Sequence, residues 1–374
     1  DQPQPGRGPQ PADGQPAEKA LTAWGRSNRY AGSKDRAAVR DHVYDVLRQK
    51  RSVAYLGGGT TGRALILGLL RSQGADPNDV FGSGGYGPDA LLPDETHIPS
   101  GEMDDPVALD LPDWLWPIWA ADLDDLAVSS AHILQSRAPI ALRVNLRRGS
   151  IAAVQTSLAA EGIETCTVAS VPTALLVTQN ARRVRQSQVF SQGLCDLQDV
   201  SSQQAVAKLT IPAGARVLDY CAGGGGKALA LADMHDATIT AHDIAPERTV
   251  DIAPRADRAG VAIEVLRTQD LASQSPFEVV FCDAPCSGSG TWRRTPESKW
   301  TIDQVKLNNF NVLQGEVIMN ASRYVARDGI LIYATCSVLR SENIDVVNAF
   351  LTRCPKWTCL SVSQRFPDAT GDGF

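Results

Sequence analysis

The spacing of hydrophobic residues divides the chain into regions of different character. In the first region the spacing is helical, since Val39, Val43 and Val46 lie four and three residues apart and form one apolar stripe. A loop rich in Gly, Asp and Pro follows over residues 73–112, and a further amphipathic stretch comes after it. We therefore expect a helical domain over residues 18–136.

Short strands with one helix between them characterise the second region. Strand-like runs at residues 140–145, 165–168 and 174–178 surround a helical segment that opens after Ser150, whose hydroxyl is suited to an N-cap. This order predicts a small α+β module over residues 137–209.

From residue 211 onward, apolar runs alternate with helical segments, which is typical of a parallel sheet. We predict an α/β fold, a Rossmann-like domain over residues 210–374, placed behind the α+β module and the helical domain. The polar residues 1–17, rich in Pro, Gly and Gln, predict a flexible tail. The expected strands of the parallel sheet are residues 216–220, 238–243, 262–268, 278–283 and 329–336.

Two cysteines follow two of these strands in the same way. Asp283 ends one strand and Cys286 comes just after it, while Cys336 stands at the end of the last strand. Open α/β sheets bind ligands at the carboxyl ends of their strands. If the two strands are neighbours, about 4.8 Å apart, both thiols can face one pocket.

A glycine-rich segment follows the first strand of the parallel sheet. Glycines there allow a ligand to approach the backbone closely. Asp243 is placed to accept hydrogen bonds from a ribose and Asp270 from an adenine amino group. The glycines alone also fit a nicotinamide enzyme or a purely structural turn, but acidic residues at successive strand ends favour S-adenosylmethionine, whose sulfonium is cationic.

Two thiols and a carboxylate suit one particular reaction. Carbon 5 of cytosine is a poor nucleophile, and addition of a thiolate to carbon 6 activates it. The methyl group then transfers, a base removes the carbon 5 proton and the thiol leaves, so that one difficult step becomes several easier ones. The base must be unstacked, which favours single-stranded RNA or base flipping.

The motifs around both cysteines resemble those of the Sun/RsmB-type RNA cytosine-5 methyltransferases. The resemblance covers about residues 140–374, and residues 35–51 resemble the NusB-like helical domain that precedes this core in bacterial ribosomal RNA enzymes. The matching motifs are Asp283-Ala284-Pro285-Cys286-Ser287-Gly288, Ala334-Thr335-Cys336-Ser337, Asp219-Tyr220-Cys221-Ala222, Gly225-Gly226-Lys227, Arg293-Arg294-Thr295-Pro296, Lys299-Trp300 and Leu197-Gln198-Asp199.

The resemblance implies a role for each matching residue. Cys336 is the attacking nucleophile, Cys286 assists release of the product, and Asp283 contacts the base and the cofactor. Lys227 belongs to both the catalytic and the cofactor-binding sets. The residues expected to hold S-adenosylmethionine are Cys221, Ala222, Gly223, Gly224, Gly225, Gly226, Lys227, Asp243, Arg248, Asp270 and Asp283.

The sequence departs from the family pattern in two places. The family usually has Ala-Pro where this chain has Gly223-Gly224, so we expect a more flexible loop and weaker cofactor binding. The chain also stops at Phe374, where the family continues into a final edge strand, so we expect an exposed sheet edge or a missing tail.

Charge and composition bear on the partners. The net charge is −6, with most of the acidic excess in residues 1–130. Local basic clusters can still bind phosphates. The arginines expected to contact RNA are Arg143, Arg147, Arg148, Arg182, Arg183, Arg293 and Arg294.

The remaining expectations concern setting and alternatives. The eight cysteines include no C-x-x-C pair, so we expect no metal site, and reduced thiols indicate a cytoplasmic protein. We expect a monomer with no membrane span that methylates small-subunit ribosomal RNA. The alternatives are a transfer-RNA cytosine-5 methyltransferase and an inactive RNA-binding ribosome assembly factor.

Overall fold

The computed structural model describes residues 16–85, 87–99, 101–274 and 276–374, so nearly all of the predicted tail, residues 1–17, lies outside the described residues. The chain divides into two compact units. The first, the helical unit, comprises residues 1–137 together with 292–303. The second, the sheet unit, comprises residues 138–291 together with 304–374.

Helices make up the first unit, as the apolar stripes predicted. In its described parts, the loop over residues 73–112 contains only short helical elements, and the stretch expected as one further helix is broken at Asp124, whose φ is +48°. The elements are α1 Ala17–Ser27, α2 Ser33–Arg48, α3 Lys50–Gly57, α4 Gly62–Ser72, η1 Pro77–Asp79, η2 Pro93–Thr96, α5 Asp105–Ala108, α6 Trp116–Leu123, η3 Asp124–Leu126 and α7 Ala127–Leu134.

Helices α3 and α4 pack backbone against backbone. A Cβ atom at Gly57 would lie 1.9 Å from the carbonyl oxygen of Ala64, and one at Gly68 would lie 1.8 Å from that of Val53. Glycine at both positions is what permits the contact. Among the described residues no single helix meets the length and apolarity of a membrane span; α3 and α4 do so only as a pair bent by 97°.

The segment Trp292–Asp303 belongs to the helical unit, although we expected it inside the methyltransferase domain. Its Trp292 ring stacks on Trp119 at 6.1 Å, and Lys299 donates a hydrogen bond to the Arg48 carbonyl at 3.2 Å. Burial of these large side chains stabilises the segment within the helical unit. The segment contains α14 Pro296–Thr301, and the long helix α15 Gln304–Ala321 follows it in the sheet unit.

The α+β module forms the first part of the sheet unit. Its four-stranded antiparallel sheet has the order β2-β3-β1-β4, and the Ser150 hydroxyl caps α8 by accepting from the Ala153 amide, as predicted. Strand β4 was not predicted, because three residues carry no readable alternation. The elements are β1 Ile140–Val144, α8 Ile151–Ala160, β2 Thr165–Thr167, β3 Ala174–Val177, η4 Ala181–Gln186, α9 Gln188–Ser191, β4 Cys195–Leu197 and α10 Val200–Ala207.

All five predicted strands of the parallel sheet are confirmed, in the order β7-β6-β5-β8-β9. The strand order reverses beside β5, and such a switch point is where doubly wound sheets bind ligands. The elements are β5 Ala215–Asp219, α11 Gly226–Met234, β6 Ala237–His242, η5 Pro246–Arg248, α12 Ile252–Ala259, β7 Ile263–Leu266, α13 Thr268–Gln274, β8 Phe277–Asp283, η6 Ser322–Tyr324, β9 Val325–Ala334, η7 Arg340–Glu342 and α16 Ile344–Arg353.

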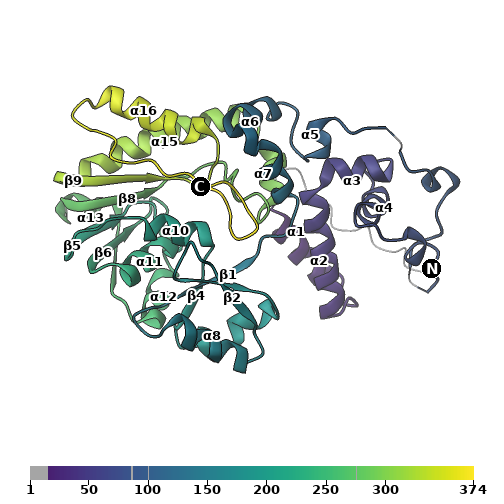
Figure 1. Ribbon diagram of the computed structural model, residues 1–374, viewed down its shortest axis with the longest axis horizontal. Helices are drawn as coiled ribbons and strands as arrows, with labels where there is room; N and C mark the ends of the chain where they lie inside the picture. Colours follow the sequence, from purple (N-terminus) through teal and green to yellow (C-terminus); the bar gives the residue numbers. More distant parts are fainter. Residues whose placement is uncertain (1–15, 86, 100, 275) are drawn as a thin grey trace. The chain divides into compact units, whose positions relative to one another are not determined.

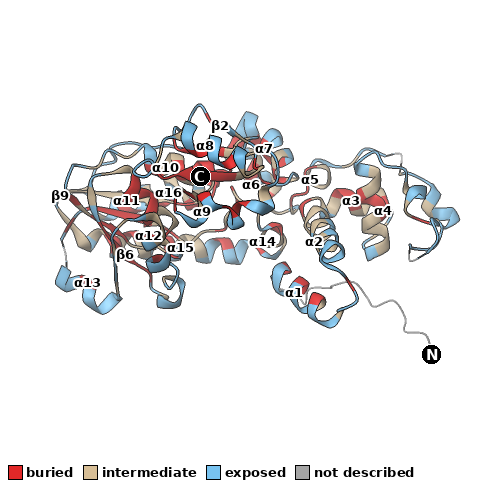
Figure 2. Ribbon diagram, turned by 90° about the horizontal axis from the view of Figure 1, so that it is seen from below, coloured by how far each residue is buried: buried red, intermediate tan, exposed pale blue. Residues whose placement is uncertain are grey.

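Helices cover both faces of this sheet (Figure 1). Val279 and Phe281 of β8 pack with residues of α11 and α12, whereas Val280 and Cys282 pack with α13 and α15 on the other face. Alternation along a strand sends neighbouring side chains to opposite faces, which explains the continuous apolar run. The strands β5, β6 and β8 are mostly buried, whereas β7 and β9 at the two edges have only intermediate and exposed residues (Figure 2).

Candidate active site

The two cysteines singled out in the sequence lie side by side. Strands β8 and β9 are parallel neighbours, with Asp283 opposite Ala334 in the register. The sulfur atoms of Cys286 and Cys336 are 3.3 Å apart, and both side chains are half-buried. The predicted adjacency of the two strands and of the two thiols is therefore confirmed.

Backbone hydrogen bonds join the two loops that carry these cysteines. The Ala284 amide donates to the Ala334 carbonyl at 2.8 Å, and the Gly290 amide donates to the Cys336 carbonyl at 3.0 Å. The first loop turns at Gly288, whose φ of +70° favours glycine. A Cβ atom there would also lie 3.9 Å from the Cys336 sulfur, in van der Waals contact with it. Glycine therefore leaves this side of the sulfur uncovered.

A lysine and a carboxylate stand beside the thiols. The Lys227 ammonium, in the first turn of α11, donates to Asp283 at 2.5 Å. Burial lowers the pKa of Lys227, but the charge of Asp283 and its hydrogen bond outweigh burial and raise it overall. Lys227 is therefore a fixed positive charge at this site, rather than a solvated helix start.

The two thiols have opposite proton affinities. The hydrogen bond from Cys286 and the charge of Lys227 lower the pKa of Cys336 against the opposing effect of burial. The hydrogen bond with Cys336 and burial raise the pKa of Cys286. Within the pair, Cys336 therefore ionises more readily than Cys286, and the thiolate is the more nucleophilic form.

The glycine-rich loop between β5 and α11 adopts backbone conformations that favour glycine. Gly223 has a φ of +49° and Gly225 one of +77°. Asp243, which follows β6, accepts a hydrogen bond from the Gly223 amide at 2.9 Å, and the Arg248 guanidinium lies 3.2 Å from the same carboxylate. The structure thus brings Asp243 and Arg248 to the loop, as the sequence suggested.

An arginine that the sequence did not single out also holds this loop. Arg255 on α12 donates one hydrogen bond to the Gly224 carbonyl and a second, of 2.7 Å, to Asp196 of β4. The loop is therefore fixed from the side of the α+β module. Since Gly223-Gly224 replaces the more rigid Ala-Pro, this contact offsets part of the expected flexibility.

Asp219, the last residue of β5, is fully buried at the base of the glycine-rich loop. Neither carboxylate oxygen has a hydrogen-bond donor in good geometry among the residues the structure describes. Burial and the charge of Asp283 raise the pKa of Asp219 to about 8. An unsatisfied buried carboxylate beside an open glycine loop suits a ligand that carries amino and hydroxyl donors and a positive charge, as S-adenosylmethionine does.

Asp270 is less closely tied to this group. It lies exposed in the first turn of α13, after β7. Cys221 and Ala222 lie half-buried between β5 and the glycine-rich loop. Their predicted contacts with the cofactor stay predictions.

The arginines expected to contact RNA separate into two groups. Arg143 and Arg293 are buried, with 3% and 1% of their surface exposed, so the prediction is wrong for both. Arg143 forms an ion pair with the buried Asp233 and donates to Gln198 at 2.7 Å, and Arg293 lies in the helical unit. Arg294 is half-buried in that unit as well.

The other four arginines are exposed on the sheet unit. Arg147 and Arg148 donate to backbone carbonyls outside the α+β module, Arg147 to that of His235 and Arg148 to that of Arg258. They therefore also hold the α+β module against the rest of the unit. Arg182 and Arg183 lie on the exposed turn η4.

The sequence analysis missed a buried polar cluster behind the cysteines. Glu342, Gln314 and Ser337 are fully buried and hydrogen-bonded to one another or to the cysteine loops. Glu342 follows Cys336 by six positions in a polar stretch that looks like an exposed helix start. Nothing in that local pattern signals burial, because two of the residues that donate to Glu342, Ser287 and Gln314, are distant in the sequence.

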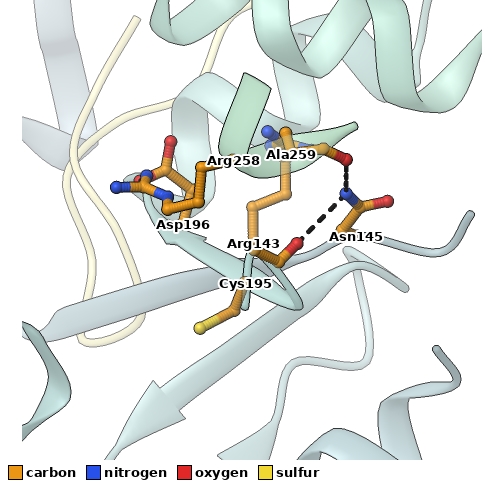
Figure 3. A pocket seen from close by; sticks show the side chains of 7 residues that line it. Arg143, Asn145, Cys195, Asp196, Arg258 and Ala259 are labelled. Atoms are coloured by element: carbon orange, nitrogen blue, oxygen red, sulfur yellow. Dashed lines mark hydrogen bonds and ion pairs between the residues drawn. The ribbon is translucent and has the colours of Figure 1, made fainter. Parts of the chain in front are cut away.

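A small pocket lies elsewhere in the sheet unit, where the α+β module meets α12 (Figure 3). Asn145 donates to the Ala259 carbonyl at 2.8 Å across it, and Arg258 pairs with Asp196 at 3.0 Å. It is a gap in a packing contact, not part of the cysteine site. Across the described ranges, no group of three or more His, Cys, Asp and Glu side chains is placed to hold a metal ion.

Comparison with known proteins gives matches to two family models, one over the parallel-sheet region and one over an earlier part of the chain. Residues 206–371 match the family described as 16S rRNA methyltransferase RsmB/F, and residues 111–184 match the RsmF/B-like ferredoxin-like domain. The ribosomal RNA small subunit methyltransferase B of Xylella fastidiosa (strain 9a5c) is 36% identical over 255 residues, which are 64% of this chain and 60% of that protein. The chain thus spans about 60% of the length of this curated relative.

Two solved structures share the fold. The structure of PH0851 superposes with a TM-score of 0.73 at 21% identity, covering 96% of this chain and 93% of that one. NSun6 from Pyrococcus horikoshii with SFG superposes with a TM-score of 0.60 at 15% identity, covering 70% of this chain and 96% of that one. These likenesses support a Rossmann-like methyltransferase fold. Through its ferredoxin-like and methyltransferase domains, the chain belongs to the RsmB/F methyltransferase family.

Proposed function

We propose that this protein methylates carbon 5 of a cytosine in small-subunit ribosomal RNA, with S-adenosylmethionine as methyl donor. The observation that carries the proposal is the pair of cysteine sulfurs 3.3 Å apart at the carboxyl ends of β8 and β9. A single nucleophile would need only one thiol, so the pair favours a covalent route with a separate step of release. The names of the relatives support ribosomal RNA as the substrate.

Cys336 acts as the nucleophile in this proposal. Its Sγ atom bonds to carbon 6 of the cytosine, and the electron pair of the 5,6 double bond then makes carbon 5 nucleophilic. After methylation a base removes the carbon 5 proton, the 5,6 double bond re-forms and the Sγ–carbon 6 bond breaks. Cys286 lies beside that bond, within hydrogen-bonding distance of the Cys336 sulfur, and assists the elimination.

Asp283 and Lys227 act on the other side of the base. Addition of a thiolate leaves negative charge toward N3 of the ring, and the positively charged member of the Lys227–Asp283 pair can stabilise that charge. Lys227 holds the Asp283 carboxylate at 2.5 Å and so fixes the orientation of both groups. The pair thus serves two purposes, since its positive member also favours the thiolate of Cys336.

The bound cofactor would supply an electrophilic methyl group. Asp219, Asp243 and the glycine-rich loop from Cys221 to Lys227 would hold it, with Arg248 at the rim. This fit rests on the unsatisfied carboxylate of Asp219 and on the backbone conformation of the loop. NSun6 from Pyrococcus horikoshii, which shares the fold, was solved with SFG.

RNA would reach the site across the sheet unit. The exposed arginines 147, 148, 182 and 183 supply positive charge, and the target base must leave its stack before a thiol reaches carbon 6. A monomeric state and a cytoplasmic location belong to this proposal and stay predictions.

The deciding experiment measures tritium transfer from labelled S-adenosylmethionine to purified RNA. We expect transfer to small-subunit ribosomal RNA and not to transfer RNA, and bisulfite sequencing of ribosomal RNA from a deletion strain would locate the cytosine. Labelling of transfer RNA alone would contradict the proposed substrate. Cofactor binding without transfer to any RNA would instead indicate an inactive assembly factor.

A further inference from the structure

A buried carboxylate lies behind the two cysteines and connects their loops. Glu342 ends the turn η7 and has no exposed surface. It accepts hydrogen bonds from the Ser287 amide at 2.8 Å and from the Ser287 hydroxyl at 2.5 Å. It also accepts from the Ser337 hydroxyl at 2.5 Å and from the Gln314 amide group at 3.1 Å.

The donors to Glu342 stand next to both reactive groups. Ser287 directly follows Cys286, and Ser337 directly follows Cys336. The Gln314 side chain, held by Glu342, also donates to the Pro285 carbonyl on the other side of Cys286 at 2.9 Å. One carboxylate therefore fixes the backbone around both sulfur atoms.

A second layer of hydrogen bonds tightens the same connection. The hydroxyls of Ser289 and Ser337 are 2.8 Å apart, and Ser289 also accepts from the Val338 amide at 2.9 Å. Asn343 accepts from the Thr335 hydroxyl at 2.5 Å and donates to the Ser337 carbonyl at 2.8 Å. Every one of these bonds touches one of the two cysteine loops.

Burial of a carboxylate is costly unless donors replace its water. Four donors converge on Glu342 and offset that cost, because charge-assisted hydrogen bonds are stronger than neutral ones. If one partner were removed, the remaining groups would be left buried and unsatisfied, so the cluster is coupled. A residue needed only for packing would not require four hydrogen-bond donors from three segments of the chain.

We propose that Glu342 is the positioning residue of the cysteine pair: it sets the distance and orientation of the two sulfur atoms. It touches neither base nor cofactor and acts through the two loops. The inference rests on the proposed function for its catalytic consequence, while the effect on thiol geometry stands by itself.

Three substitutions separate geometry from charge. Glu342→Gln keeps the length of the side chain, and its amide nitrogen can take the place of Oε2 if the hydroxyls of Ser287 and Ser337 both turn to accept from it, so we expect a mild effect. Glu342→Asp shortens the reach by one methylene, so it cannot hold both loops at once. Glu342→Ala removes all four bonds, and a displacement of about 1 Å at a reacting group can cost about 100-fold in rate.

The first readout needs no methylation. A short bifunctional thiol reagent, dibromobimane, is added to the full-length protein, and the Cys286–Cys336 cross-link is quantified by mass spectrometry. We expect rapid cross-linking in the natural protein and in Glu342→Gln, and slow cross-linking in Glu342→Ala and Glu342→Asp. The second readout is steady-state methylation, where kcat should fall about 100-fold in Glu342→Ala with the Kd for S-adenosylmethionine unchanged.

Asp233→Asn is the matched control. Asp233 is also buried and pairs with Arg143, but away from the cysteine loops. It should lower the melting temperature without changing the cross-linking rate or kcat. Cross-linking and kcat in Glu342→Ala and Glu342→Asp equal to those of the natural protein would overturn the proposal, as would equal losses in Asp233→Asn. If the natural protein methylates no RNA, the proposed function fails, and the cross-linking series still decides the role of Glu342.

Discussion

Two side chains of the same type differ in chemistry at this site because their neighbours differ. Cys336 has the charge of Lys227 and a hydrogen bond from Cys286 to lower its pKa, while the partner thiol keeps its proton. A thiolate attacks and a thiol does not. The assignment of nucleophile and helper, which the resemblance implied, thus has a physical reason in this chain.

Replacing the nucleophile should stop methyl transfer without weakening cofactor binding. In Cys336→Ala we expect no measurable methyl transfer, because the sulfur that adds to carbon 6 is lost. Calorimetry should give an unchanged affinity for S-adenosylmethionine. Residual turnover above background in this variant would rule out the assigned role.

Replacing the second cysteine should have a different outcome. In Cys286→Ala, addition and methylation proceed but elimination is slowed, so the RNA stays bonded to Cys336. We expect a slowly migrating protein–RNA adduct on a denaturing gel, absent from Cys286→Ala/Cys336→Ala. If no adduct forms with the single variant, Cys286 has another role.

The charge of Lys227 should be visible in the pH dependence of the thiol. Lys227 lowers the pKa of Cys336, so Lys227→Met raises it, and the acid limb of reactivity moves to higher pH. Alkylation of Cys336 by iodoacetamide, followed across pH by mass spectrometry, measures this directly. Lys208→Met removes an exposed lysine that contacts Ser363 instead, and its profile should not move. An unshifted profile in Lys227→Met would contradict the argument.

At the scale of elements, the sequence predicted the strands that are marked by apolar runs. It missed features that depend on contacts with residues distant in the sequence. The strands before Asp283 and Cys336 were found because buried parallel strands are continuously apolar. The short strand β4 Cys195–Leu197 was missed because its identity depends on pairing with β1 Ile140–Val144. Arg143 was misread as a nucleic-acid contact, since only the fold shows that Asp233 faces it.

The glycine-rich loop shows how one element supports another. Arg255 of α12 connects Asp196 in the α+β module to the Gly224 carbonyl. Figure 3 shows the neighbouring Arg258 with the same aspartate. The loop is therefore held by hydrogen bonds of Arg255, which also connect it to the α+β module. The residue spacing within the loop did not reveal this contact.

Loss of the hydrogen bond from Arg255 to the Gly224 carbonyl should weaken cofactor binding. In Arg255→Ala the Gly224 carbonyl loses its donor, the loop gains conformational freedom, and we expect the Kd for S-adenosylmethionine to rise about tenfold, equivalent to about 1.4 kcal/mol. Arg258→Ala is the control, because Arg258 also pairs with Asp196 but is not the donor to Gly224. Calorimetry compares the two, and equal affinities would show that the loop holds its shape unaided.

For the whole molecule, the net charge was a poor guide to binding partners, and the positions of the exposed arginines are a better one. The chain carries −6 overall, and its acidic excess lies mainly in the N-terminal part, whereas the four exposed arginines of the predicted RNA-contact set lie on the sheet unit. Phosphate contacts act locally, since exposed charges are screened within about 10 Å at moderate salt. A negative total therefore does not argue against an RNA substrate.

The salt dependence of RNA binding tests this view. Arg182 and Arg183 lie on the exposed turn η4 Ala181–Gln186. If each neutralises one phosphate, Arg182→Ala/Arg183→Ala should lower the slope of log K against log salt by about 1.4, since a single strand releases about 0.7 counterion for each phosphate contact. The matched control is Arg327→Ala: the Arg327 side chain is 96% exposed near the start of β9, away from the carboxyl ends of the strands. Fluorescence anisotropy with a ribosomal RNA fragment over a range of salt gives both slopes. If the double variant and the control have the same slope, the RNA lies on another surface, and the η4 arginines serve only solubility.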